Sequence, residues 1–291
     1  MINIESSFRG AMLASGITTD APIIADGQLH RFHVEGGKPG SRSGWLVLHD
    51  GNHPAGAFGC YKRSISVKWR ADQRTPGARS NPIDIALIEA RRMVRATEAE
   101  RAYSDAAKRA GQILSSATID AHDHAYIKRK NILPFGVHQT QSGVLIIPIY
   151  DARTTKLQTV QFIDAAGGKK FLAAGRTAYG CFPLRHDRES FTQALQLRIG
   201  VAEGLGTGAT LAHVMGRSTA MFSAFSASNL INVATALRKQ HPTAEITIYG
   251  DNDVSGVGQN AAIKAAIAVR GFVAIPPSTG MDWQDYAEAS R

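Results

Sequence analysis

Acidic residues follow two apolar segments in the last third of this 291-residue chain. Asp251 and Asp253 stand one residue apart after "EITIYG", and Glu203 comes directly after "LRIGVA". Alternate residues of an extended segment point to the same side, so the two aspartates can share one ligand. Crowded carboxylates repel each other unless a cation holds them, and hard oxygen ligands suit Mg²⁺ or Mn²⁺. The pattern predicts a divalent-metal site that also binds substrate phosphates.

A third acidic group, Asp282 and Asp285, lies in "GMDWQDYAEAS" near the end of the chain. Residues 196–291 hold seven acidic residues, and five of them belong to the three groups. An aspartate after a strand also commonly caps the next helix, and this alternative stays open for Asp251 or Asp253 alone. Capping accounts poorly for all five together, so the cation-binding interpretation is favoured.

The segments around these acids alternate between strand and helix patterns. Strands are predicted at 197–204, 219–225, 245–251 and 272–276, and helices at 207–216, 229–242 and 258–271. Apolar strands that alternate with helices predict a parallel sheet covered on both faces. Ligands of such sheets bind beyond the carboxyl ends of the strands, where Glu203 and the Asp251/Asp253 pair are expected.

The string "GLGTGA" formally matches a dinucleotide-binding fingerprint after a strand. That fingerprint requires an acid about 20 residues later to hold the ribose. No Asp or Glu occurs between Glu203 and Glu245, and no Gly-Lys-Ser/Thr is present. Dinucleotide binding is therefore not favoured, and the glycines are expected to allow a tight backbone turn beside Glu203.

The rest of the chain divides into shorter patterns. A helix is expected near residues 8–13, strand candidates at 29–36, 44–51, 56–69, 143–151 and 157–164, and a long helix or helical pair at 83–116. Residues 70–82 have the composition of a linker. We expect a small mixed unit (1–72), a linker and helical connector (73–120), a basic subdomain (121–195) and the acidic module (196–291).

Charge is distributed unevenly along the chain, whose formal net charge is +9. Residues 1–125 hold 16 basic and 13 acidic side chains, residues 126–195 hold 10 and 4, and residues 196–291 hold 7 and 7. The middle segment therefore carries +6. This excess suits a surface that faces a polyanion, although charge alone is equally consistent with a solvated basic surface.

Aromatic and basic residues alternate in the first part of the chain. The aromatics are Phe32, Trp45, Phe58, Tyr61 and Trp69, and the bases are Arg31, Arg42, Lys62, Arg63 and Lys68. Such a mixture can stack against and neutralise single-stranded DNA. Aromatics of a small β unit more often form its core, and that interpretation is favoured.

No stretch approaches the length of a membrane helix, and the first residues do not resemble a signal peptide. Two cysteines, Cys60 and Cys181, suggest neither a disulfide framework nor a zinc ribbon. A cytoplasmic location without membrane contact is expected. His122 and His124 lie near each other, and a surface or capping role is favoured over metal binding.

The order Glu-Gly, Asp-x-Asp and a closing Asp pair resembles a Toprim domain, the metal-binding module of bacterial-type primases, type IA and II topoisomerases and some nucleases. The wider chain resembles the Toprim primases of plasmids and phages. The strings that carry this likeness are "ADGQLHRFHVEGGKPGS", "GWLVLHDG", "PAGAFGCYK", "HAYIKRKNI", "GVLIIPIYD", "LQTVQFID" and "KKFLAAGR". The resemblance implies an α/β fold in which a Rossmann-like Toprim sheet follows a basic α+β subdomain and a small mixed unit.

The resemblance also implies the roles of individual residues. Glu203, Asp251 and Asp253 would be catalytic, and the same three would bind Mg²⁺ or Mn²⁺ with Asp282 and Asp285. Single-stranded DNA and ribonucleoside triphosphates would be bound by Lys128, Arg129, Lys130, Lys169, Lys170 and Arg176. The implied activity is that of a DNA primase, a nucleotidyltransferase that makes RNA primers, with a replicative helicase or initiator as a further partner.

Two departures from the family pattern stand out. Thr207 occupies the position where bacterial replicative primases carry a further aspartate, which leaves the number of metal ions open. The sequence also lacks the Cys/His zinc module that many primases use to engage template. Two alternatives to a primase therefore remain: a Toprim nuclease, which shares the acids, and a non-catalytic regulator that binds single-stranded nucleic acid.

Overall fold

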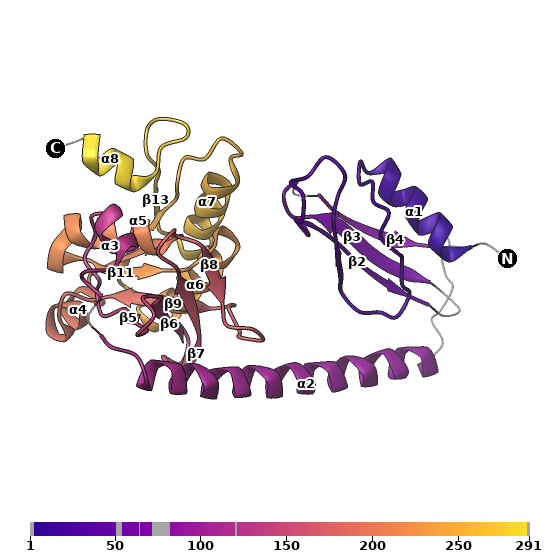
Figure 1. Ribbon diagram of the computed structural model, residues 1–291, viewed down its shortest axis with the longest axis horizontal. Coiled ribbons are helices and arrows are strands. Elements are labelled where there is room, and N and C mark those ends of the chain that lie inside the picture. Colours follow the sequence, from indigo (N-terminus) through magenta and orange to yellow (C-terminus); the bar gives the residue numbers. More distant parts are fainter. Residues whose placement is uncertain (1–2, 51–53, 64, 72–81, 120, 290–291) are drawn as a thin grey trace. The chain divides into compact units, whose positions relative to one another are not determined.

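The computed structural model describes residues 3–50, 54–63, 65–71, 82–119 and 121–289 (Figure 1). The chain forms two compact units, Met1–Leu87 and Ile88–Arg291. Among the described residues, no helix has the length and apolar character needed to cross a membrane. The expected linker at 70–82 falls almost entirely outside the described residues.

The first unit is one helix packed on an antiparallel sheet. Its elements are α1 (Ile4–Ala14), β1 (His30–Phe32), β2 (Gly44–His49), β3 (Ala55–Cys60) and β4 (Ile65–Arg70), and the strand order is β1-β2-β3-β4. Phe8 of α1 contacts Phe58 and Trp69 edge-to-face, with ring centroids 5.2 and 5.1 Å apart. The strand candidate at 56–69 is in fact two paired strands, β3 and β4.

Helix α2 (Pro82–Ser115) is one continuous helix rather than a helical pair. Its C-terminal part packs on the second unit, where Ala106 and Ala110 are fully buried. Ala110 lies in a small apolar cluster with Ile146 and Val160. The small side chains of α2 let the helix approach the sheet closely at this point.

The second unit is built on a nine-stranded sheet in the order β13-β12-β10-β11-β9-β6-β7-β8, with β5 paired to β6 beside this path. The four strands from β13 to β11 are parallel, and the remaining pairs are antiparallel. The strands are β5 (His138–Gln139), β6 (Leu145–Asp151), β7 (Leu157–Ile163), β8 (Lys169–Phe171), β9 (Gly180–Leu184), β10 (Arg198–Ala202), β11 (Ala220–Ser223), β12 (Glu245–Tyr249) and β13 (Phe272–Ala274).

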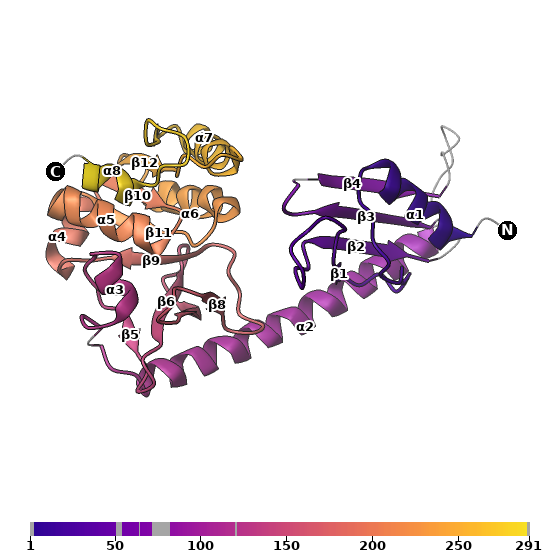
Figure 2. The ribbon, with the colours of Figure 1, turned by 45° about the horizontal axis from the view of Figure 1, so that its top comes forward.

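Helices cover both faces of the parallel strands, as predicted from the sequence (Figure 2). Helices α6 and α7 share one core with Ile199, Val201 and Ile248, whereas α5 shares another with Met221 and Tyr249. The helices of this unit are α3 (Ala125–Arg129), α4 (Arg188–Ala194), α5 (Leu205–Met215), α6 (Ala227–Gln240), α7 (Val257–Val269) and α8 (Trp283–Ala289), with a 3₁₀ turn at Gly216–Ser218. Successive side chains of each strand alternate between the two cores.

The chain turns tightly beside Glu203, as predicted, because only Glu203 and Gly204 separate β10 from α5, and residues from Leu205 onward are already helical. Gly204 is the N-cap of α5 and has a negative φ of −112°. A Cβ on Gly208 would lie 2.7 Å from Cδ1 of Leu184 on β9. Glycine at that position therefore allows α5 to approach the sheet closely.

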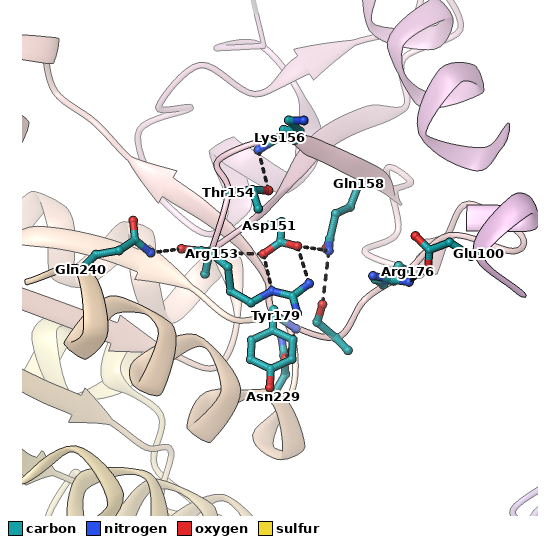
Figure 3. A network of polar contacts seen from close by, with 12 residues as sticks. Glu100, Asp151, Arg153, Thr154, Lys156, Gln158, Arg176, Tyr179, Asn229 and Gln240 are labelled. Atoms are coloured by element: carbon teal, nitrogen blue, oxygen red, sulfur yellow. Dashed lines mark hydrogen bonds and ion pairs between the residues drawn. The ribbon is translucent and has the colours of Figure 1, made fainter. Parts of the chain in front are cut away.

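The middle segment and the acidic module share this one sheet, because β9 pairs with both β6 and β11. Polar contacts reinforce the junction (Figure 3). Asn229 on α6 accepts a hydrogen bond from the N–H of Tyr179 and donates one to the carbonyl of Gly180, each 2.9 Å long. The basic segment is thus held firmly against the acidic module. The fourfold division at residues 72, 120 and 195 stays a prediction.

Candidate active site

The three central acids follow two neighbouring parallel strands. Glu203 comes directly after β10, while Asp251 and Asp253 come after β12, and the last residues of the two strands, Ala202 and Tyr249, are paired. Their carboxyl ends therefore meet at one edge of the sheet.

Asp251 is half-buried and lies among charged neighbours. Burial raises the pKa of Asp251, and the carboxylates of Asp282 and Asp253 raise it further. The hydroxyl of Thr207 opposes this shift by donating a hydrogen bond of 3.1 Å to Oδ1 of Asp251. The charge on Asp251 is therefore only partly compensated by the protein.

Glu203 is in a similar position. Burial raises the pKa of Glu203, with further contributions from the charges of Asp251 and Asp253. The backbone N–H of Ala227, at the start of α6, and the charge of Lys169 act in the opposite direction. Two neighbouring acids whose ionisation is disfavoured by burial and mutual repulsion form a site that a bound cation would stabilise.

Asp253 makes the helix-capping contacts that the alternative interpretation requires. Its Oδ2 accepts the N–H of Gly258 at 2.8 Å, and its Oδ1 accepts the hydroxyl of Ser255. The hydrogen bond from Ser255 is the largest cause that lowers the pKa of Asp253. A carboxylate has about four lone-pair sites, so these bonds leave room for a cation.

Gly258, in the first turn of α7, lies next to the carboxylates of Asp253 and Glu203. A Cβ at this position would lie 2.8 Å from Oδ2 of Asp253 and 3.7 Å from Oε2 of Glu203. Both carboxylate oxygens therefore border the same small space above the glycine. The missing side chain keeps that space open.

Replacing Gly258 by Ala is expected to reduce activity by about tenfold or more, because a contact of 2.8 Å forces the Asp253 carboxylate to move. Unfolding should change little, since Ala is favoured over Gly in a helix by roughly 1 kcal/mol, which offsets the local strain. Activity assays and thermal unfolding of the variant test this expectation. Gly111→Ala is a control, because Gly111 has open space around it. Full activity of Gly258→Ala would contradict the assignment of this space to the site.

Asp282 and Asp285 form a reciprocal cap at the start of α8. Oδ1 of Asp282 accepts the N–H groups of Gln284 and Asp285 at 2.8 and 2.9 Å, and Oδ2 of Asp285 accepts the N–H of Asp282 at 3.2 Å. Oδ2 of Asp282 also pairs with Nζ of Lys130 at 3.7 Å. Asp282 therefore belongs electrostatically to the acidic site, whereas Asp285 is exposed and is used in capping.

Two lysines of the middle segment lie beside the acids. Lys130 pairs with Asp282, and its charge lowers the pKa of Asp251. Lys169 is exposed at the edge of the sheet, and its pKa is lowered by partial desolvation and by the charge of Lys130, whereas Glu203 and Asp251 oppose that shift. The ammonium lies 5.9 Å from the centre of the Tyr126 ring. Cationic and acidic groups thus face the same region.

The other four predicted basic residues have different surroundings. Lys128 pairs with Asp123 at 2.8 Å, and Lys170 follows Lys169 on β8, so the two side chains point to opposite faces. Arg129 donates to the carbonyl of Ala165 at 3.0 Å and lies over the Tyr126 ring.

Arg176 lies at a separate location. It pairs with Glu100 of α2 and stacks over Tyr103 with its guanidinium carbon 4.5 Å from the ring centre. Figure 3 shows Arg176 in the network around Asp151. The structure therefore divides the six predicted basic residues between several places, and only Lys130 and Lys169 act on the acids.

A family model matches the part of the chain that carries these acids. The family model that matches the chain is described as a Toprim domain and covers residues 198–290, which include all five predicted acids. Residues 198–290 are a Toprim domain. The predicted α/β fold with this domain at its C-terminal end is confirmed.

Curated relatives extend the likeness beyond the Toprim domain. Two proteins from Escherichia coli, both named DNA primase TraC, are 34% identical over 289 residues and 31% identical over 293 residues. Each match covers 94% of this chain, but only 26% and 19% of the relatives' own lengths. The resemblance to Toprim primases of plasmid type is confirmed.

Three solved structures were also matched, each with a TM-score below 0.5. A DnaG catalytic core has a TM-score of 0.42 at 11% identity and covers 66% of this chain and 76% of its own. The primase fragment of the bacteriophage T7 primase-helicase has a TM-score of 0.41 at 13% identity and covers 80% and 86%. The RNA polymerase domain of Mycobacterium tuberculosis DnaG has a TM-score of 0.35 at 16% identity and covers 58% and 60%.

The Toprim acids fit a Mg²⁺ or Mn²⁺ ion that is bound partly by the protein and partly by the phosphates of the substrate. Within the described ranges, no three His, Cys, Asp or Glu side chains are grouped so that they could hold a metal ion. Mg²⁺ usually binds through one or two carboxylates together with waters and substrate phosphates. The open space at Gly258, which is bordered by oxygens of Asp253 and Glu203, suits that mode.

Two side chains that the sequence did not single out support the Toprim site. The indole of Trp283 donates to the carbonyl of Gly250 at 3.0 Å, and its ring contacts Tyr249 edge-to-face. Gln284 donates to the carbonyl of Lys130 at 3.1 Å, which ties α8 to the basic segment. The only signal in the sequence was the position of both residues between the closing aspartates.

The favoured capping role for a histidine is confirmed at His124. Its Nδ1 accepts the N–H of Tyr126 at 3.0 Å, and its Nε2 lies 2.8 Å from the carbonyl of Gly143. His124 is therefore a buried N-cap of α3, the helix that carries Lys128 and Arg129.

Proposed function

We propose that this protein is a DNA primase that joins ribonucleotides on a single-stranded DNA template with the help of Mg²⁺ or Mn²⁺. One observation supports this proposal most strongly. Glu203 and Asp251 of the Toprim sheet interact electrostatically with two lysines of the basic segment, Lys130 and Lys169. Nucleotidyl transfer requires both a cation site for the triphosphate and positive groups that hold it.

Asp251, Asp253 and Asp282 would hold the divalent ion, with Asp285 as the outermost member of the group. When bound, the ion supplies charge stabilisation for the triphosphate and lowers the pKa of the primer 3′-hydroxyl. Glu203, whose pKa is raised by burial, would accept the proton of that hydroxyl or complete the metal site. The 3′ oxygen forms the new bond to the α-phosphorus, and pyrophosphate leaves.

The basic residues would divide the binding of substrates between them. Lys130 and Lys169 lie beside the acids and would hold the triphosphate. Lys128, Arg129, Lys170 and Arg176 would contact the phosphates of the template strand. A replicative helicase or replication initiator would supply the single-stranded template.

A Toprim nuclease is the main competing function, because hydrolysis of a phosphodiester uses the same acids and metal. The similarity to DNA primase TraC over 94% of the chain favours the primase. The third candidate, a regulator that binds single-stranded nucleic acid without catalysis, does not account for the raised pKa values of Glu203 and Asp251. Acids whose ionisation is disfavoured by burial and by charged neighbours are more typical of functional sites than of the rest of a protein.

One assay separates the three functions. The protein is incubated with single-stranded DNA, labelled ribonucleoside triphosphates and Mg²⁺ or Mn²⁺, and the products are separated by length. We expect new labelled oligomers that depend on both template and metal. Shortened template would identify a nuclease, and a bound but unchanged template would identify a regulator.

A further inference from the structure

The antiparallel sheet of the first unit has one face that α1 does not cover. Helix α1 packs on the face that carries Phe58 and Trp69, and Figure 1 shows it on one side of β3 and β4. Strand alternation and the pairing register assign the residues of the opposite face. They are Arg31, Trp45, Val47, His49, Ala55, Ala57, Gly59, Ser66, Lys68 and Arg70.

Two aromatic rings form a platform on this face. Trp45 is paired with Gly59, and a Cβ on that glycine would lie 2.8 Å from two indole carbons, so the indole packs directly on the glycine. Tyr61, directly after β3, is 59% exposed, and its ring centre is 6.1 Å from that of Trp45 at an angle of 40°. The guanidinium of Arg31 lies 4.7 Å above the Tyr61 ring.

The charge of the face is uniformly positive. Arg31, Lys68 and Arg70 are exposed, and the ten residues assigned to this face include no acid. Lys68 follows the row of Val47 and Ala57, so its nearest cross-strand neighbours on this face are uncharged. Aromatic rings between unopposed cations are the features that single-strand-binding surfaces share.

The structure also corrects the sequence-based interpretation of the five aromatics. Phe32 and Phe58 are buried in the core and Trp69 packs against it, as favoured from the sequence. Trp45 and Tyr61 belong to the other face and are not part of that core. The five residues therefore have two different roles.

We propose that this face of the first unit binds single-stranded nucleic acid, with bases stacked on Trp45 and Tyr61 and phosphates held by Arg31, Lys68 and Arg70. A single strand exposes the base faces that such rings need, whereas a duplex hides them. The proposal concerns binding alone, so it does not rest on the chemistry proposed for the Toprim site.

The first test measures the affinity of the full-length chain for fluorescently labelled 15-nucleotide oligo-dT and oligo-U. Trp45→Ala and Tyr61→Ala should each weaken binding by about 5- to 150-fold, the range for loss of one stacked base. A larger effect on oligo-dT would identify DNA as the preferred strand, and a larger effect on oligo-U would identify RNA. Unchanged affinity for both strands in the double variant would overturn the proposal.

Intrinsic fluorescence provides a test that does not depend on stability. The chain has three tryptophans, and Trp45 is the one placed on this face. Oligo-dT should quench the fluorescence of the wild type and of Trp69→Phe, but not that of Trp45→Phe. Both changes retain an aromatic ring, so folding is expected to survive. Equal quenching in the two variants would contradict the stacking of bases on Trp45.

The salt dependence of binding tests the phosphate contacts. Lys68→Ala combined with Arg70→Ala should reduce the log–log slope by about 1.4, since each contact with a single strand contributes roughly 0.7. The matched control is Lys239→Ala with Lys264→Ala, which removes two exposed charges from the second unit. An equal reduction in the control would show that net charge, rather than this face, determines binding.

Asp251→Asn separates the two proposals. This variant should bind oligo-dT like the wild type, because its change lies in the Toprim domain. Loss of primer synthesis with retained binding supports both assignments. If primers are made but Trp45→Ala and Tyr61→Ala bind normally, only the proposed surface is wrong.

Discussion

Asp251→Asn should reduce nucleotide incorporation by at least about 10²-fold, the loss typical when one charge-stabilising group is removed from an active site. The metal-free variant should unfold at the same temperature as the wild type or at a higher one. Burial and the charges of Asp282 and Asp253 disfavour ionised Asp251, and Asn removes that unfavourable charge. Product analysis and thermal unfolding measure the two effects.

The pH dependence of this stability difference follows from the raised pKa. Above the folded-state pKa of Asp251, the wild type carries the full cost of a buried charge that the variant lacks. As the pH falls through that pKa toward the unfolded value of 3.8, Asp251 becomes protonated and the cost disappears. The advantage of the variant should therefore be present at pH 7 and vanish near pH 4.

Glu245→Gln is the matched control for this experiment. Glu245 is exposed and lies at the opposite end of the same strand, β12, so the charge change is equal and the Toprim site is untouched. It should leave activity unchanged. A large loss of stability in Asp251→Asn, with activity retained, would instead identify Asp251 as a structural cap.

Lys169→Ala should reduce incorporation by about 10²-fold without a matching loss of stability, because its ammonium group interacts electrostatically with Glu203 and Asp251. Lys169→Arg should retain part of the activity, since it keeps the charge but changes the geometry. Steady-state assays over a range of triphosphate concentrations measure the effect, which should appear mainly as weaker use of the triphosphate.

Lys156→Ala tests whether the effect is specific. Lys156 is exposed in the turn between β6 and β7, and its removal changes the net charge of the same unit equally. If both lysine variants lose activity to the same extent, general electrostatic attraction explains the result and the position of Lys169 does not.

The regular part of the fold was predictable because its strands are buried on both faces. Buried, largely apolar strands such as β11 and periodic helices such as α6 can be predicted from the local sequence alone. Helices α3, α4 and α8 span five to seven residues, which is too short for a hydrophobic period to appear. Strand β9 contains Pro183, which argues against a central strand, yet it pairs on both sides.

The sequence predicted which acids form the site, but not which of them also cap helices. Spacing along the chain placed Glu203 and Asp251 at one sheet edge, because parallel strands end together. Whether Asp253 and Asp285 cap helices depends on where α7 and α8 begin, which the spacing does not determine. Lys169 lies near the acids because β9 pairs with β11, and this pairing joins parts of the chain that are distant in sequence.

In the first unit, the sequence did not determine which face of the sheet is covered by α1. Both faces of its sheet carry aromatic residues, so alternation alone does not say which face α1 covers. The contact of Phe8 with Phe58 and Trp69 decides this and leaves Trp45 on the other side.

Binding of Mn²⁺ to the full chain, followed by the loss of the paramagnetic resonance signal of free Mn²⁺, tests the central claim that the Toprim acids hold a divalent ion. The wild type and Glu245→Gln should take up Mn²⁺ equally, whereas Asp251→Asn and Asp282→Asn should each bind it at least about tenfold more weakly. Uptake by Asp251→Asn that equals the uptake by the wild type would contradict the account.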